Sequence, residues 1–90
     1  MGWTREQPPC EHLGLIQEVE PGGSGCGECL AIGDTWVHLR LCLSCGNVGC
    51  CDQSKNTHAR KHAAASEHPI VRSFEVGEEW RWCFPDSRFV

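Results

Sequence analysis

Apolar and polar residues alternate from Trp36 to Leu43, and this period of two predicts a β-strand. Its half-buried face would carry Val37, Leu39, Leu41 and Leu43. A second strand is expected over Ile70–Glu75, which combines β-branched and aromatic residues. Near the end of the chain Trp80, Trp82 and Phe84 alternate with other residues and predict a third, short strand with an aromatic side.

One helix is predicted between these strands, beginning near Ser54 or Asn56 and ending near Ser66. Either residue could cap the first turn, because serine and asparagine oxygens accept hydrogen bonds from the free backbone N–H groups there. Alanines fill the helix interior, and Pro69 stops it.

Glycine-rich segments separate the predicted elements. Pro21–Gly25 reads as a loop and Cys45–Cys50 as a tight turn. Residues 1–9 are polar with two prolines and are expected to form a flexible N-terminal arm. With no linker further on, residues 10–90 are expected to form one domain.

Composition narrows the function classes. The chain has 90 residues and a formal net charge of −4, from 8 basic and 12 acidic side chains, which argues against nucleic-acid binding. No apolar run approaches the roughly 20 residues that cross a bilayer, so no membrane association is expected. A secretory signal is also missing, and a cytoplasmic, reducing setting follows. Eight cysteines in that setting favour metal binding over disulfides.

Between Cys26 and His68, eight cysteines and histidines follow the spacing of metal ligands. They are Cys26, Cys29, Cys42, Cys45, Cys50, His58, His62 and His68. Structural zinc takes four Cys or His ligands, and a Cys pair separated by two residues is a common half-site. Disulfides would give no role to the spaced histidines. The pattern therefore predicts two zinc ions, which the half-sites could share either in chain order or crossed; spacing does not choose between these schemes.

Four further candidates lie near the chain ends. Cys10 and His12 come first, and Cys83 and Asp86 come last; together they could hold a third zinc with one carboxylate ligand. Cys51 adjoins Cys50, and we take Cys50 as the ligand because four residues separate it from Cys45. Either neighbour could serve, however, and the spacing leaves this open.

The order of these ligands resembles the UBP-type zinc finger, the ubiquitin-binding finger of deubiquitinases and of a cytoplasmic histone deacetylase. The matching segments are Cys10-x-His12, Cys26-x2-Cys29, Leu41-Cys-Leu-Ser-Cys-Gly46, Val48-Gly-Cys50, His58-x3-His62-x5-His68-Pro69 and Trp82-Cys83. The resemblance covers about residues 10–89, and Trp36-Val-His-Leu-Arg-Leu-Cys42 looks like the small stand-alone bacterial members.

The resemblance implies an α+β fold: a small zinc-stapled domain whose twisted antiparallel sheet has one or two flanking helices. It also implies crossed ligation. One zinc would take Cys26, Cys29, Cys50 and His58, another Cys42, Cys45, His62 and His68, and a third Cys10, His12, Cys83 and Asp86. Many relatives carry Cys at the position of Asp86.

Ubiquitin-binding members hold the free C-terminal Gly-Gly of ubiquitin in an aromatic pocket. The pocket positions correspond to Trp82, Phe84, Phe89 and Trp36. Those members carry Gly-Arg-Tyr after the residue matching Cys50, and their arginine helps to grip the tail. Here the segment reads Cys51-Asp-Gln53, and an aspartate repels a carboxylate, so tight ubiquitin binding is not expected.

These observations predict a non-catalytic zinc-binding module that binds a protein partner, through an extended or C-terminal peptide. Aromatic residues anchor such interfaces, and Arg81 or Arg88 could pair with a carboxylate. Catalysis is not expected, because catalytic zinc keeps an open position and the central sites look closed. The alternative is a zinc or redox sensor in which the spare thiol of Cys51 reacts.

Overall fold

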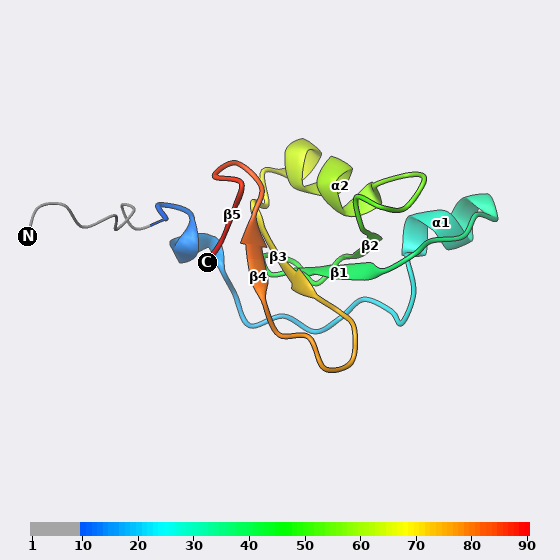
Figure 1. Cartoon of the computed structure of the whole chain (residues 1–90), viewed down its shortest axis with the longest axis horizontal. Helices are drawn as coiled ribbons and strands as arrows, with labels where there is room; N and C mark the ends of the chain where they lie inside the picture. The colour runs from blue at the N-terminus through cyan, green and yellow to red at the C-terminus, as the bar shows by residue number, and fades with distance from the viewer. Residues whose placement is uncertain (1–9) are drawn as a thin grey trace, which may run out of the picture.

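The computed structural model describes residues 10–90, and the predicted arm at residues 1–9 lies outside them. Five antiparallel strands form one sheet in the order β2-β1-β3-β4-β5 (Figure 1). The strands are β1 (Leu39–Cys42), β2 (Val48–Cys50), β3 (Ile70–Ser73), β4 (Arg81–Cys83) and β5 (Arg88–Phe89). The helices are the 3-10 turn η1 (Leu13–Leu15), α1 (Gly27–Ile32) and α2 (His58–Ser66). The predicted α+β class is confirmed.

The three predicted strands are present but shorter than expected. β1 begins only at Leu39, because the Val37 N–H donates to the Ser54 hydroxyl at 2.8 Å instead of joining a strand ladder. The Val37 side chain is 54% exposed, so its predicted place on the buried face was wrong. Leu39, Leu41 and the following Leu43 are buried as predicted. The segment predicted as a tight turn contains β2, which pairs with β1, so that prediction was incomplete.

Helix α2 lies across one face of the sheet and ends at Ser66, as predicted (Figure 1). Its beginning differs from the prediction. The helix is preceded by Thr57 in the left-handed region (φ 48°), and the Thr57 side chain makes no capping hydrogen bond. Ser54 and Asn56 are engaged elsewhere: Ser54 with the Val37 N–H, and the Asn56 amide with Asp34 at 2.9 Å.

Helix α1 was not predicted, and a metal-type ligand begins it. The Cys26 sulfur accepts a hydrogen bond from the Cys29 N–H at 3.4 Å and so takes the place of an N-cap oxygen. Gly33 ends the helix in the left-handed conformation (φ 72°). None of the helices within residues 10–90 is long and apolar enough to span a membrane.

The chain before α1 runs along the β1–β2 turn. Backbone N–H groups of Gln17 and Gly22 donate to the carbonyls of Leu43 and Gly46 at 2.8 and 2.9 Å. Gly46 has φ +86°, and a Cβ placed on it would come within 2.2 Å of the Glu20 carbonyl oxygen. This turn therefore requires glycine, both for its conformation and for the close approach of the N-terminal segment.

The core is unusually rich in sulfur. Seven of the fifteen buried apolar residues within the described range are cysteines, and the aliphatic remainder comes mainly from β1, β2 and β3. A small domain with so few large apolar side chains inside gains limited stability from burial alone. All eight cysteines are unpaired, so the structure contains no disulfide to supply the difference.

Candidate metal centres

The twelve predicted ligands gather into three groups of four, and within each group the ligand atoms lie within 4.8 Å of one another. The first cluster is Cys26, Cys29, Cys50 and His58; the second is Cys42, Cys45, His62 and His68; the third is Cys10, His12, Cys83 and Asp86. The half-sites are thus crossed along the chain, which is the arrangement implied by the family resemblance. Cys50, and not Cys51, lies in the first cluster.

The separations within the clusters fit tetrahedral zinc. Zinc–sulfur and zinc–nitrogen bonds of about 2.3 and 2.0–2.1 Å give tetrahedron edges of about 3.8 Å between sulfurs and about 3.5 Å between sulfur and nitrogen. Cys29 Sγ lies 3.9 Å from Cys50 Sγ, and His58 Nδ1 lies 3.3–3.5 Å from the three sulfurs of its cluster. The ligand atoms are spaced as the edges of a metal site and have the Cys and His chemistry that zinc prefers.

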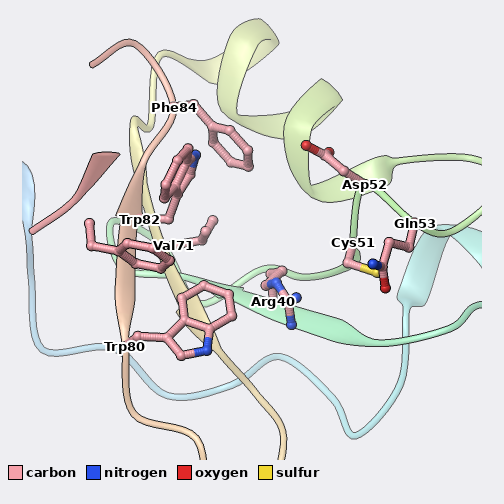
Figure 2. Close-up of a pocket in the computed structure, with 9 residues that line it drawn as sticks. Arg40, Cys51, Asp52, Gln53, Val71, Trp80, Trp82 and Phe84 are labelled. Atoms are coloured by element: carbon pink, nitrogen blue, oxygen red, sulfur yellow. The ribbon is translucent and has the colours of Figure 1, made fainter. Parts of the chain in front are cut away.

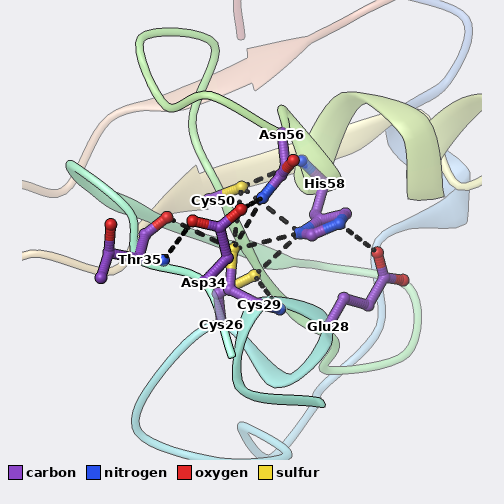
Figure 3. Close-up of polar contacts among 8 residues, drawn as sticks. All are labelled: Cys26, Glu28, Cys29, Asp34, Thr35, Cys50, Asn56 and His58. Atoms are coloured by element: carbon purple, nitrogen blue, oxygen red, sulfur yellow. Dashed lines mark hydrogen bonds and ion pairs between the residues drawn. The ribbon is translucent and has the colours of Figure 1, made fainter. Parts of the chain in front are cut away.

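The first cluster is the most enclosed (Figure 3). Its three cysteines are fully buried, and they come from the start of α1 and from β2. His58 begins α2 and points Nδ1 at the sulfurs, while its Nε2 lies 3.4 Å from the Glu28 carboxylate. A carboxylate on the far nitrogen fixes the tautomer and the orientation of a ligating imidazole.

The second cluster is more open. Cys42 is buried at the end of β1, but Cys45 is exposed in the turn that follows. His62 Nε2 lies 3.3 Å from Cys45 Sγ and 3.4 Å from His68 Nδ1. Burial lowers the pKa of His62, and the neighbouring His68 lowers it further, which favours the neutral form of the His62 imidazole that binds metals.

The third cluster joins the two ends of the described chain. His12 Nδ1 lies 3.7 Å from Cys10 Sγ, 3.4 Å from Cys83 Sγ and 3.5 Å from an Asp86 oxygen. The pKa of Asp86 is lowered by its hydrogen bond with Cys10 and by His12, so its carboxylate is ionised. Asp86 and His12 are each about one third exposed, which makes this cluster more accessible than the first.

Burial opposes ionisation of the thiols. Desolvation raises the pKa of Cys29 and of Cys83 to about 11, and it raises the pKa of Cys42 as well. Thiols with such pKa values are neutral at pH 7 on their own. A coordinated cation deprotonates them outright, so the clusters can act as ligand sets only when a metal supplies the positive charge.

Cys51, the alternative ligand to Cys50, lies outside the clusters, and so does His38. Cys51 is only 3% exposed, and its sulfur contacts the Ser54 hydroxyl at 3.5 Å. Burial alone would raise the pKa of its thiol, but the hydrogen bonds from Ser54 and from nearby backbone groups outweigh burial and lower it. His38 is exposed, and its carbonyl accepts from the Cys51 N–H.

An aromatic pocket of about 210 Å³ opens on the sheet beside the start of α2 (Figure 2). The nine residues that line it are Arg40, Cys51, Asp52, Gln53, Val71, Trp80, Trp82, Phe84 and Phe89. The Phe89 ring packs edge-on against Trp82 and Trp80, with centroids 4.9 and 5.6 Å apart. Three of the four predicted partner-binding residues therefore meet in one hollow.

Trp36 does not line this pocket. The Trp36 ring lies against Gly25, and a Cβ added to Gly25 would come within 2.9 Å of a ring carbon. Trp36 also packs against the core. Neither Arg81 nor Arg88, the two arginines that the sequence offered as carboxylate partners, lines this pocket. Arg81 Nε donates to the Val90 carbonyl at 3.1 Å, and Arg40 is the arginine in the pocket, with its guanidinium 4.5 Å from the centre of the Trp80 ring. Arg40 alternates with buried leucines in β1. This alternation could have shown that Arg40 lies on the opposite face of the sheet, where the aromatic residues are.

Known proteins match the chain in family and in fold. Residues 26–90 match the family described as a zinc finger in ubiquitin hydrolases and other proteins. A protein of Rhodopseudomonas palustris, solved by solution NMR, is 45% identical with a TM-score of 0.82 over 93% of this chain and 82% of its own. No curated protein matches the sequence. On this family match and its three Cys/His clusters, the chain belongs to the zinc fingers of the ubiquitin-hydrolase type.

Proposed function

We propose that the chain is a non-catalytic protein-interaction module that three zinc ions hold together, one in each cluster. Each cluster offers four protein ligands, which leaves no open position for a reacting water in a tetrahedral site. The ions tie α1, β1, β2, α2 and the chain ends to one another. Zinc fingers of this type are generally non-catalytic, in keeping with a binding role.

The partner is an extended peptide whose C-terminal carboxylate enters the aromatic pocket. One observation carries this proposal: Arg40 faces a hollow with four aromatic rings and has no carboxylate partner within the described part of the chain. Its one hydrogen bond runs from Nη1 to the Leu39 carbonyl at 2.9 Å, which leaves other N–H groups for a ligand. The aromatic walls suit an apolar last side chain.

Asp52, the acidic residue of the pocket, does not oppose an incoming carboxylate with its full charge. Its two oxygens accept hydrogen bonds from Arg60 Nε at 3.1 and 3.0 Å, and Arg60 Nη2 adds a third contact. Arg60 also lies 4.9 Å from the centre of the Phe84 ring. The ion pair neutralises the charge of Asp52. Arg40 is then the charged group that acts on a ligand in the pocket, and it favours a negatively charged one.

Peptide titration tests this function. The tryptophan fluorescence of the zinc-loaded domain would be followed with one hexapeptide in two forms, with a free C-terminal carboxylate and with a C-terminal amide. A charge-assisted hydrogen bond is worth about 1.5–3 kcal/mol, so the amide should bind roughly 10- to 150-fold more weakly.

Two variants complete the test. Arg40→Ala should abolish the difference between the two peptides, whereas Lys61→Ala, which removes an equal charge from the exposed side of α2, should preserve it. Equal affinity of carboxylate and amide for the parent domain would overturn the proposal. Ubiquitin with a free C-terminus is a separate arm, and we expect weak binding because Asp52 stands where ubiquitin binders carry arginine.

A further inference from the structure

Each sulfur of the first cluster receives one N–H group. The Cys29 N–H donates to Cys26 Sγ at 3.4 Å, and the His58 N–H donates to Cys50 Sγ at 3.1 Å. The Cys29 sulfur receives its donor from a side chain, since Asn56 Nδ2 lies 3.6 Å away (Figure 3). Two of the three donors belong to the backbone and follow from the fold. The third depends on the identity of one residue.

Asn56 is held in place by a second set of contacts. The same amide nitrogen donates its other hydrogen to an Asp34 oxygen at 2.9 Å. Asp34 also accepts from the Thr35 N–H at 2.8 Å and pairs with Lys55 at 3.2 Å. This carboxylate lies in the loop after α1, so the contact links that loop to the segment before α2 and aims the Asn56 amide at the cluster.

We propose that Asn56 is a positioning residue for the first zinc ion, and that its amide slows the loss of that ion by stabilising the Cys29 thiolate. The inference rests on the ligand assignment proposed above. Three thiolates and one neutral imidazole around Zn²⁺ would carry a net charge of −1 at a site whose three sulfurs belong to fully buried cysteines. Hydrogen bonds from N–H groups to the sulfurs offset this charge, and partners of the ligands typically change metal affinity 10- to 100-fold.

The physical consequence is specific to one sulfur. Without the amide, Cys29 would be the one thiolate of the cluster that lacks a donor, and its electron density would rise. A hydrogen-bond donor offsets part of the negative charge of a metal-bound thiolate, so removing the Asn56 amide leaves the charge of the first site less well compensated and weakens its hold on the ion. Asn56 therefore affects how long the first zinc is retained, and it leaves the second and third clusters untouched.

The experiment uses cadmium as the probe, since the first proposed site has three sulfurs and the other two sites have two each. In the cadmium-113 NMR spectrum of the loaded domain, the first cluster, with three sulfurs, should give a resonance separate from the other two. In Asn56→Ala this resonance should shift, and zinc transfer to a chelator from that site should become about ten-fold faster. Asn56→Asp, which replaces the donor with an anion facing Asp34, should be faster still.

Two controls separate positioning from general stability. Gln53→Ala removes an exposed amide from the same loop and should leave both readouts unchanged. Asp34→Ala, which removes the anchor and keeps the amide, should give an intermediate rate. If Asn56→Ala shifts no resonance and releases zinc at the parent rate, the inference is wrong. If the parent shows no three-sulfur resonance at all, the proposed ligand assignment fails instead.

Discussion

Gly49→Ala tests whether the close approach of β2 to α2 holds the first cluster together. Gly49 pairs with Arg40 in the sheet and faces the start of the helix. A Cβ on Gly49 would lie 2.8 Å from the Ala59 nitrogen and 2.9 Å from its Cα. Both are backbone atoms, so no side-chain rotation can relieve the contact.

The size of the effect follows from these distances. Ordinary van der Waals contact begins at 3.4 Å, so the strand and helix must separate by 3.4 − 2.8, or about 0.6 Å. Cys50 follows Gly49, and His58 precedes Ala59, so the shift moves two ligands of one ion apart. Metal–ligand distances tolerate about 0.2 Å. We expect a loss of about 1–3 kcal/mol from overpacking and weaker metal binding at the first cluster.

Thermal unfolding of the zinc-loaded protein and the cadmium-113 spectrum measure the two parts of this prediction. Gly27→Ala is the matched control, because Gly27 also lies next to a ligand but its Cβ would meet nothing within 4 Å. That helical position should be neutral or stabilised by about 0.5–1 kcal/mol. A Gly49→Ala protein with the parent unfolding temperature and spectrum would refute the reasoning, as would equal damage from Gly27→Ala.

Four other outcomes are expected. Removal of metal by a chelator at pH 7 should abolish the near-UV circular dichroism of the tryptophans, because each structural zinc contributes roughly 10–16 kcal/mol of apparent binding energy; a persistent signal would show that burial suffices. Gly46→Ala should lower the free energy of unfolding by at least about 1–2 kcal/mol, since alanine is strained at φ +86°, and chemical denaturation measures it. Asp86→Ala should cost one metal ion by native mass spectrometry and leave the rest bound; loss of all would contradict the independence of the third cluster. Cys51→Ser should slow peroxide-triggered zinc release if Cys51 is a sensor, and an unchanged rate would leave it a packing residue.

The sequence was most informative where chemistry limits the choice of residue. Cysteine and histidine at zinc-type spacings identified the residues that meet in the three clusters, although spacing left their partition open and the family resemblance supplied it. Alternation predicted β1 and β4, and a run of β-branched and aromatic residues predicted β3. The buried leucines of β1 followed from the same period of two.

Other features depend on contacts between distant segments. β2 was read as part of a turn because the Cys45–Cys50 segment contains two glycines, and its pairing with β1 is a tertiary interaction. The predicted caps of α2 failed because Ser54 and Asn56 find partners twenty or so residues away. Arg40 in the pocket was missed for a related reason: a strand pattern shows which side a residue faces, and not what is packed on that side.

One turn of α2 separates His58 from His62, and these two side chains serve different clusters. The ordering of that turn is therefore a cost common to both coordination spheres. Binding of the first cation offsets most of the conformational entropy lost when this turn orders, and the second cation binds an imidazole that is already aligned. Uptake at the two central positions should consequently show positive cooperativity, with half-loaded molecules scarce at substoichiometric metal.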